Sequence, residues 1–335
     1  FVDLCLSLVE FEQEVQAICL KNSKSAEILS RHPQVQLDTI SVLGTWDPFA
    51  PAKISRLALE HKSEVVQAHL ARGALLTGKA LKKIALPLVV TTHNYIDTKY
   101  YQYVTMLVPP TRDQYKYYLG KGVKADRLKL INHFTSLQAK EKSNASDPSI
   151  LRIVTLGRLV TKKGFHVLLD AFAKLQERTK RKCELYIGGT GPEQEALIAQ
   201  IETLDLTDKV KMVGWLDDVP GFLQEADLFV LPSLDEPFGI VVLEAMAYAL
   251  PIVSSDSQGP VEILDEDCAW LSKTGDADSL ATAMQHACDD YEERKRKSEN
   301  VLSKFKQKYS KQVVIPEFLN LYASLLTTKN KPSQH

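Results

Sequence analysis

Residues 227–250 read DLFVLPSLDEPFGIVVLEAMAYAL and place a buried strand, a short loop and a helix in immediate succession. The apolar run at 228–231 predicts the strand, and the pattern from about Ile240 predicts the helix. Open α/β sheets bind ligands at such strand-to-helix corners. Because a helix begins with unpaired N–H groups, we expect the backbone amides of Gly239, Ile240 and Val241 to receive a phosphate.

Two carboxylates flank this expected phosphate site. Glu236 lies on the loop and Glu244 lies one turn into the helix, so both are expected to face the same corner. Carboxylates repel phosphate but accept hydrogen bonds from neutral hydroxyls, such as those of a ribose on one side and a hexose on the other. The residues alone leave a second interpretation open, in which Glu236 is a helix N-terminal charge and Glu244 belongs to a solvated helix face.

Two further corners of this kind lie earlier in the chain. Residues 157–165 read GRLVTKKGF and follow a predicted strand, which places Arg158 and one of the next lysines at the strand end. Two cations there can neutralise a diphosphate and stabilise it as a leaving group. Residues 188–192 (GGTGP) form a glycine-rich turn before another helix. Three such corners in one half of the chain favour a ligand that carries both phosphates and hydroxyls.

The rest of the chain alternates short apolar runs with amphipathic stretches, which predicts an α/β fold with parallel sheets covered on both faces. The pattern occurs in each half, so we expect two Rossmann-like, doubly wound domains that face each other across a cleft. The predicted strands lie at 65–67, 88–92, 106–108, 129–132, 153–157, 184–188, 210–213, 228–231 and 252–254. The clearest predicted helices lie at 167–177, 192–204, 240–249 and 316–326, the last of them beginning at Pro316.

A polar stretch at 136–149 separates the two halves. We expect an N-terminal domain at 1–145, a C-terminal domain at 150–310, and a C-terminal helix and tail at 311–335 that crosses back to the first domain. Residues 1–10 already read as a helix, so the first domain is expected to lack its opening strand and glycine-rich turn.

Composition excludes several classes of protein. The 335 residues are 44% hydrophobic and 25% charged, as in globular domains and unlike disordered or collagen-like chains. No apolar run reaches the roughly 18 residues of a membrane-spanning helix. The five cysteines lack the spacing of a metal site, which favours reduced thiols and a cytoplasmic location. A net charge of −1 without a nucleic-acid-binding motif argues against a nucleic-acid partner.

The charge is distributed unevenly. Residues 1–145 carry 19 basic and 13 acidic side chains, whereas the remainder carries 22 and 29. A basic first half predicts an anionic partner, and basic segments such as residues 79–83 suit peripheral contact with an anionic membrane at its inner face. The alternative is that each basic cluster is a solvated helix face.

The three corners, together with VGWLDDVPGFLQ at 213–224 and QGPVEIL at 258–264, resemble the retaining GT-B glycosyltransferases of family 4 over residues 153–322. The resemblance implies that residues 150–310 bind a nucleotide-sugar donor and that the first domain binds the acceptor. It implies Glu236 beside the donor sugar hydroxyls and Glu244 on the ribose. The further implied donor contacts are Arg158 and Lys163 on the diphosphate, the amides of Gly239, Ile240 and Val241, and Leu216 and Asp217 beside the nucleobase.

In the first half, two histidines follow predicted strands. The resemblance implies that His93 lies near the reacting sugar, where it positions and stabilises polar groups. His69 ends the preceding strand, and we expect it to contact the acceptor together with Arg72 and Tyr95. The alternatives are that His69 is structural and that the tyrosines around Tyr95 are packing residues. The family's common Pro-Asn-Gly turn is replaced here by Asn132-His133-Phe134, which weakens the expectation for this turn.

The resemblance implies metal-independent transfer of a hexose or N-acetylhexosamine, with retained configuration and without a cofactor, from a UDP-sugar in preference to a GDP-sugar. The expected acceptor is a hydroxyl of a glycan or glycolipid, such as a lipid-linked glycan of lipopolysaccharide or capsule. Asp217 and Asp218 are not interpreted as a metal site. Two alternatives stay open, a catalytically inactive nucleotide-sugar-binding subunit and a GT-B sugar-nucleotide epimerase.

Overall fold

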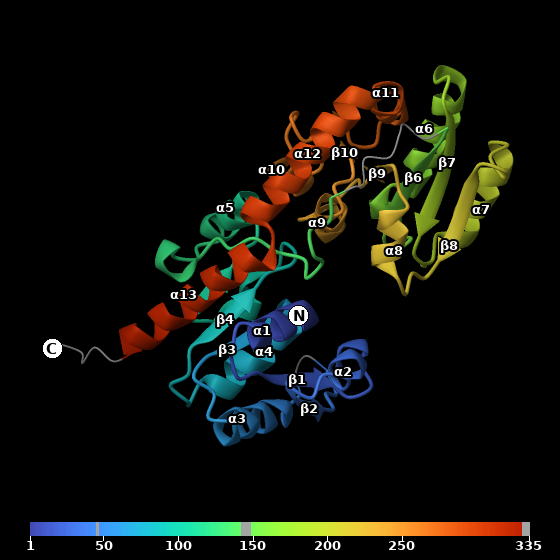
Figure 1. The fold of residues 1–335 in the computed structure, drawn as a ribbon. Coiled ribbons are helices and arrows are strands. Elements are labelled where there is room, and N and C mark those ends of the chain that lie inside the picture. The colour runs from blue at the N-terminus through green and yellow to red at the C-terminus, as the bar shows by residue number, and fades with distance from the viewer. Residues whose placement is uncertain (45–46, 142–148, 330–335) are drawn as a thin grey trace. The chain divides into compact units, whose positions relative to one another are not determined.

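The computed structural model describes residues 1–44, 47–141 and 149–329. The chain divides into two compact units, and each is described by itself (Figure 1). Unit 1 comprises Phe1–Ser136 together with the segment from Lys311, and unit 2 comprises Leu137–Ser310. The division after residue 136 lies at the start of the polar stretch 136–149 in which the sequence analysis placed the boundary, and residues 142–148 of that stretch lie outside the described residues.

Unit 2 is built on a single parallel sheet. Among the described residues its strand order is β11-β10-β9-β6-β7-β8. Its strands are β6 (Ile150–Leu156), β7 (Lys182–Gly188), β8 (Val210–Gly214), β9 (Leu228–Leu231), β10 (Ile252–Ser255) and β11 (Ala269–Ser272). The chain starts in the middle at β6, moves outward to β8, then returns to β9 and moves outward the other way, which is the doubly wound order.

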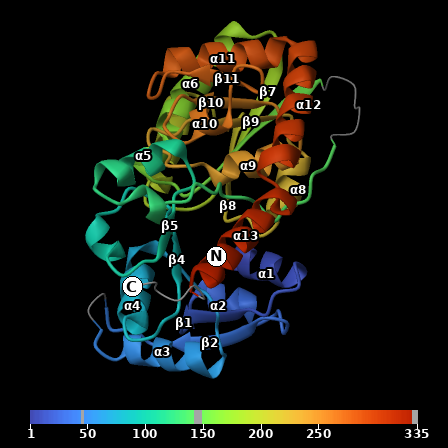
Figure 2. The ribbon, with the colours of Figure 1, turned by 90° about the vertical axis from the view of Figure 1, so that its left-hand side faces the viewer.

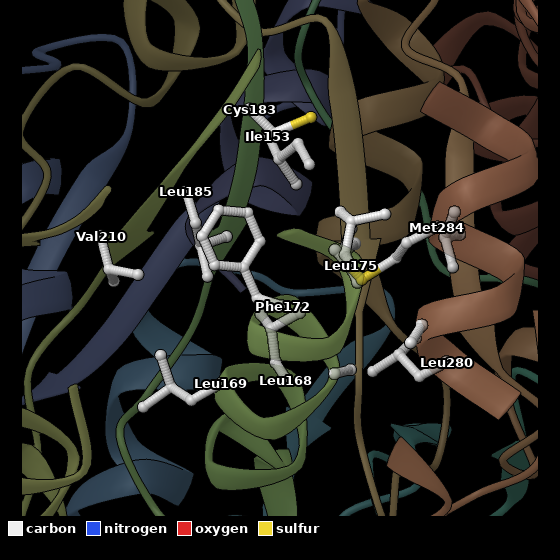
Figure 3. Packing of buried hydrophobic residues seen from close by; sticks show 14 of the residues in the cluster. Ile153, Leu168, Leu169, Phe172, Leu175, Cys183, Leu185, Val210, Leu280 and Met284 are labelled. Atoms are coloured by element: carbon white, nitrogen blue, oxygen red, sulfur yellow. The ribbon is translucent and has the colours of Figure 1, made fainter. Parts of the chain in front are cut away.

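Helices cover both faces of this sheet. They are α6 (Phe165–Arg178), α7 (Gln194–Thr203), α8 (Val219–Gln224), α9 (Ile240–Ala247), α10 (Pro260–Ile263), α11 (Ala277–Asp289) and α12 (Tyr291–Lys308), with the 3₁₀ turn η3 (Thr161–Lys163). Alternate residues of the strands face opposite ways, so Leu228 and Val230 pack towards α6 and α11, whereas Phe229 and Leu231 pack towards α9 and α12. Figure 3 shows the first of these cores, with Phe172 of α6 among strand residues and residues of α11.

The parallel strands of unit 1 form two sheets. The first pairs β1 (Gln16–Leu20) with β2 (Gln36–Ile40), and the second has the order β3 (Val66–His69), β4 (Leu88–Thr91), β5 (Met106–Val108). The helices are α1 (Val2–Glu10), α2 (Lys24–Leu29), α3 (Ala50–Glu60), α4 (Leu70–Leu81), α5 (Arg112–Gly120) and α13 (Lys311–Lys329), with the 3₁₀ turns η1 (Thr98–Tyr101) and η2 (Ala125–Arg127).

Two helices join the sheets of unit 1 into one layered body. Helix α1 buries Cys5 against β1 and Leu4 against β4 and β5. Helix α4 buries Leu76 against residues of the first sheet and Ala74 against the second. The first domain is thus α/β and parallel as predicted, but its sheet is divided between β1 and β3, which share no ladder among the described residues.

The predicted strand at 129–132 is wrong. Leu128 forms an isolated bridge with Leu107, and Ile131 donates one backbone hydrogen bond to Pro109. β5 continues into Pro109 and Pro110, which have no N–H groups, so a regular ladder cannot form beside them.

The last helix also differs from its prediction. Helix α13 begins at Lys311, so Pro316 lies inside the helix rather than at its start. The lost backbone hydrogen bond is outweighed by burial, because Val314, Ile315 and Phe318 are at most 3% exposed against the core of unit 1. Figure 2 shows α13 beside α1, as the two helices pack within the same unit.

Candidate active site

The carboxyl ends of β6 and β9 form the centre of the candidate site in unit 2. These two strands are neighbours in the sheet, and the chain moves outward from them in opposite directions. The crevice outside their ends is where doubly wound sheets bind ligands. Residues 157–164 follow β6 and residues 232–239 follow β9, so two of the predicted corners meet there.

Backbone hydrogen bonds join these two loops. The amides of Leu234 and Asp235 donate to the carbonyl of Lys162 over 2.8 and 3.2 Å. The ammonium of Lys163 forms an ion pair with the carboxylate of Glu236, and the two side chains are only 20% and 9% exposed. The structure therefore brings together two predicted site residues that are 73 positions apart in the sequence.

Gly164 makes this meeting of loops sterically feasible. Its φ of +68° lies in the left-handed region, and a Cβ at this position would stand 2.1 Å from the carbonyl oxygen of Pro232. That is far inside van der Waals contact, so only glycine fits between η3 and the loop after β9. Gly164 thus fixes how closely the Lys163 loop approaches the Glu236 loop.

Backbone hydrogen bonds also join the glycine-rich loop after β7 to the loop after β6. The amide of Gly157 donates to Gly188 over 3.0 Å, and the amide of Leu159 donates to Thr190 over 3.0 Å. A Cβ at Gly189 would lie 1.9 Å from the carbonyl oxygen of Gly157. The third predicted corner therefore supports the Arg158 loop through backbone contacts, and Arg158 itself has an exposed side chain.

Helix α9 begins at this site. Gly239 is its N-cap with a φ of +100°, and the amide of Val242 donates to the carbonyl of Gly239 over 2.9 Å. The N–H groups of Ile240 and Val241 precede that first bond and open the helix, as predicted. The loop before the helix is held by the amide of Gly259, which donates to the carbonyl of Glu236 over 2.8 Å.

The other residues predicted to contact a donor are Glu244, Leu216 and Asp217. Glu244 is half-buried within α9. Leu216 is half-buried and packs closely on Gly188, where a Cβ would lie 2.4 Å from Leu216 Cδ1. Asp217 is exposed and accepts a hydrogen bond from Trp215 Nε1 over 3.0 Å.

Unit 1 contains a row of three histidines. His69 ends β3 and His93 follows β4, and Nδ1 of His69 lies 3.2 Å from Nε2 of His93. The ring of His133 stacks on His93 with centroids 4.8 Å apart and an angle of 18°. Burial lowers the pKa of His93 to about 4 and lowers the pKa values of His69 and His133 well below the usual range.

Two other residues predicted to contact an acceptor have different surroundings. The hydroxyl of Tyr95 donates to the carboxylate of Asp113, and its ring packs edge-on against Tyr117 at 5.1 Å. Arg72 is exposed on α4. Their roles stay predictions.

His133 is the residue that the sequence analysis did not select. It stands where the expected Pro-Asn-Gly turn has asparagine, and it follows residues 129–132, which were predicted as a strand but form none. The sequence did carry one indication of His133. His69 and His93 each follow a predicted strand, and His133 similarly lies a few residues after Leu128, which bridges to Leu107.

Within the described ranges 1–44, 47–141 and 149–329, we find no cluster of three or more His, Cys, Asp or Glu side chains arranged to hold a metal ion. In the same ranges, none of the helices combines the length and apolar character needed to cross a membrane.

The residues that match a known protein family lie within unit 2. Residues 137–303 match the family model described as "Glycosyl transferases group 1". The lipopolysaccharide core biosynthesis glycosyltransferase LpsE of Rhizobium meliloti is 31% identical over 202 residues, which are 59% of this chain and 58% of LpsE. LpsD of the same organism is 29% identical over 67% of this chain and 65% of LpsD. The chain thus spans less than two thirds of either relative.

Solved structures identify the fold of the whole chain. Alr3699/HepE of Anabaena, in complex with UDP and glucose, superposes with a TM-score of 0.82 at 18% identity over 96% of both chains. Sucrose-phosphate synthase of Thermosynechococcus elongatus superposes with a TM-score of 0.78 at 18% identity over 97% of this chain and 92% of that chain. Both are GT-B proteins, and this chain has the GT-B fold.

Proposed function

We propose that the protein transfers a sugar from a nucleotide diphosphate donor to a hydroxyl of a glycan, because residues 137–303 match the family model of the glycosyl transferases group 1. The observation that carries the proposal is the junction of the loops after β6 and β9. It places a cation, a carboxylate and the first amides of α9 at the switch point of one sheet.

The donor contacts follow from the charges of these groups. The diphosphate binds the cationic side chains of Arg158 and Lys163 and the amides of Ile240 and Val241. The carboxylate of Glu236 accepts hydrogen bonds from the donor sugar. When the donor binds, the ammonium of Lys163 turns from Glu236 towards phosphate, so the ion pair holds both groups in place beforehand.

The nucleoside binds on the two sides of this junction. Glu244 accepts hydrogen bonds from the ribose, and Leu216 and Asp217 border the base. UDP is the favoured nucleotide, and the UDP-containing structure of HepE, which shares the fold, supports this choice.

The reaction breaks the bond between the sugar's anomeric carbon and the diphosphate oxygen, whose electrons leave with the diphosphate. The acceptor oxygen attacks the same carbon from the same face, and its proton passes to the departing phosphate. Configuration is therefore retained. Arg158, Lys163 and the amides of α9 stabilise the charge that develops on the leaving group, without a metal ion or cofactor.

We assign the acceptor to unit 1, with His93, His69, Arg72 and Tyr95 as the candidate residues for binding sugar hydroxyls. The named activity of LpsE and LpsD supports a glycan of lipopolysaccharide or another envelope polysaccharide as the acceptor class. The excess of basic residues in 1–145 supports contact with an anionic membrane at its cytoplasmic face.

Product analysis tests the proposal. The protein is incubated with UDP-hexoses and UDP-N-acetylhexosamines and a panel of core-type glycolipid acceptors, and products are assigned by mass spectrometry and by the anomeric proton coupling. We expect one donor to give a product with retained configuration. Arg158→Ala should lower kcat about 10²–10³-fold.

The matched control is Arg178→Ala. It removes a cation from the last turn of α6, where Arg178 pairs with Asp278, and should leave turnover near that of the unaltered chain. An inverted product would contradict the same-face mechanism. Donor binding without transfer to any acceptor would favour a nucleotide-sugar-binding subunit.

A further inference from the structure

The loop that carries Glu236 is supported by a second segment, residues 255–259, which begins at the last residue of β10. The hydroxyl of Ser255 donates to the carbonyl of Ser233 over 2.6 Å, at the start of the loop. Three residues later, the carbonyl of Glu236 accepts a hydrogen bond of 2.8 Å from the amide of Gly259. The segment therefore holds the loop at two points.

These two bonds complement those from the loop after β6. The amides of Leu234 and Asp235 both donate to the carbonyl of Lys162. Each of the consecutive residues 233–236 is thus held by a group from outside the loop. Because each residue is held, the backbone of Glu236 is fixed before any ligand binds, and binding costs little further ordering of the loop.

Ser257 orients the hydroxyl of Ser255. The two side-chain oxygens lie 3.2 Å apart. A serine hydroxyl has one proton, and that of Ser255 is used on the carbonyl of Ser233, so Ser257 is the donor between the two serines. Both serines are buried, at 2% and 4% exposure, where water cannot readily replace a lost bond. The two hydroxyls therefore form a directed chain that ends on the loop.

Gly259 packs directly against the same loop. Its φ of −73° is one that any residue adopts, so the backbone conformation does not require glycine. A Cβ at this position would nevertheless lie 2.4 Å from Cα of Phe238 and 2.6 Å from its carbonyl oxygen. Glycine is needed here for space, and the segment and the loop are in contact at the level of the backbone.

The supporting segment is itself anchored to the edge of the sheet. The carboxylate of Asp256 accepts hydrogen bonds from the amide and the hydroxyl of Thr274 over 2.8 and 2.6 Å. The bond from this hydroxyl holds the pKa of the Asp256 carboxyl below its usual range. The amide of Asp256 donates to the carbonyl of Ser272, the last residue of β11, over 2.8 Å. The loop after β9 is thus tied through this segment to the strand at the edge of the sheet.

We propose that Ser255 is a positioning residue for sugar transfer, whose hydroxyl, oriented by Ser257, fixes the loop that presents Glu236 to the donor sugar. This inference rests on the proposed function. Ser255 acts through Glu236 rather than by touching the donor, because its side chain is buried against the loop. Such support matters for the rate, since a misplacement of about 1 Å at a reacting site can lower turnover about 10²-fold.

Hydrogen exchange of the unliganded full chain tests the support without any substrate. Ser255→Ala removes the hydroxyl, and Ser255→Cys fills similar space with a weak donor. In both variants, mass spectrometry should show the amides of residues 232–239 exchanging about fivefold faster, as expected for the loss of one buried hydrogen bond. The matched control is Ser272→Ala, which removes another buried serine hydroxyl, one that bonds to the carbonyl of Ser254 instead. It should leave this exchange unchanged.

Turnover separates positioning from general support of the fold. With the UDP-sugar that gives a product in the panel above, Ser255→Ala and Ser255→Cys should lower kcat by up to about 10²-fold and leave KM for the acceptor unchanged. Ser257→Ala should lower kcat by less, because the bond of Ser255 to the loop remains. Ser272→Ala should keep the kcat of the unaltered chain. Circular dichroism verifies that each variant is folded at the assay temperature.

The outcomes separate the inference from the proposed function. Unchanged exchange of residues 232–239 in Ser255→Ala, or equal acceleration in Ser272→Ala, would overturn the inference. It would also be overturned by faster exchange with an unchanged kcat, since the bond would then support only the fold. Unaltered behaviour of Ser255→Cys would assign the effect to packing and overturn it as well. Faster exchange in both Ser255 variants, without transfer by the unaltered chain from any donor, would support the positioning of the loop and count against the proposed function.

Discussion

Replacing Gly164 by alanine tests the junction between the two loops of the candidate site. Gly164 adopts a φ of +68°, and the new Cβ would lie 2.1 Å from the carbonyl oxygen of Pro232. A left-handed alanine costs roughly 1–2 kcal/mol. Relieving the overlap by a shift of backbone costs about 1–3 kcal/mol more. The free energy of unfolding should therefore fall by about 2–5 kcal/mol in Gly164→Ala.

Gly214→Ala is the matched control for this variant. Gly214 has a φ of +77° in the same unit, and nothing lies within 4 Å of its added Cβ. It should lose only the roughly 1–2 kcal/mol of left-handed strain. The two variants are compared by urea unfolding followed by tryptophan fluorescence, and by thermal unfolding. A difference of about 2 kcal/mol corresponds to a Tm about 4–8 °C lower for Gly164→Ala in a unit of this size.

The same comparison extends to ligand binding. Moving the loop after β6 away from the loop after β9 also separates Lys163 from Glu236, so Gly164→Ala should weaken nucleotide binding more than Gly214→Ala does. Equal losses of stability in the two variants would refute the close approach at Pro232. Undisturbed nucleotide binding in Gly164→Ala would refute the role of this junction in the site.

Three further predictions concern single contacts and titrations. In a double-mutant cycle of Lys163→Met and Glu236→Gln, the two substitutions should be coupled by about 1–3 kcal/mol in the free energy of unfolding. If the losses of stability in the two single variants simply add up in the double variant, the half-buried ion pair is contradicted. The pKa of His93 is about 4 in the folded chain and about 6.5 in the unfolded chain, because burial disfavours the charged imidazole. Stability is therefore highest above pH 6.5, and up to about 3 kcal/mol of it is lost as the pH falls towards 4. Denaturant midpoints measured from pH 7 to pH 5 should therefore fall less in His93→Phe than in the unaltered chain, and parallel curves would contradict the shift. All five cysteines are free and buried, and burial raises the pKa of Cys5 to about 12 and of Cys268 to about 11. A thiol reagent at pH 8 should therefore react only after denaturant is added. Rapid labelling of the native chain would contradict this packing.

The sequence predicted unit 2 in detail because its signals are local. The run that forms β9 (LFVL) is apolar throughout and that of β10 (IVSS) begins with two apolar residues, and every residue of both strands is buried, as expected for strands covered on both faces. β11 was missed because its four residues, AWLS, are too few to show a period. β1 and β2 were missed because they mix polar and apolar residues, QAICL and QLDTI, at partly exposed positions.

Contacts between distant residues could not be predicted in the same way. The sequence placed Lys163 and Glu236 in one site, but their ion pair depends on the approach of two loops that only the fold brings together. The stacking of His133 on His93 likewise joins two segments that share no sequence period. Pro316 was placed at a helix start by its preference for the first turn, whereas the burial of Val314 and Ile315 extends the helix before it.

The most direct test of the donor site is nucleotide binding to the intact chain. The thermal unfolding temperature is measured without added metal in the presence of UDP, GDP or ADP, for the unaltered chain and for Arg158→Ala. A ligand at 100 times its Kd adds about 2.7 kcal/mol to stability. We expect UDP to raise Tm, GDP and ADP to raise it less, and Arg158→Ala to abolish the effect. An unchanged Tm with all three nucleotides, or an equal rise in Arg158→Ala, would contradict a diphosphate site at the carboxyl ends of β6 and β9.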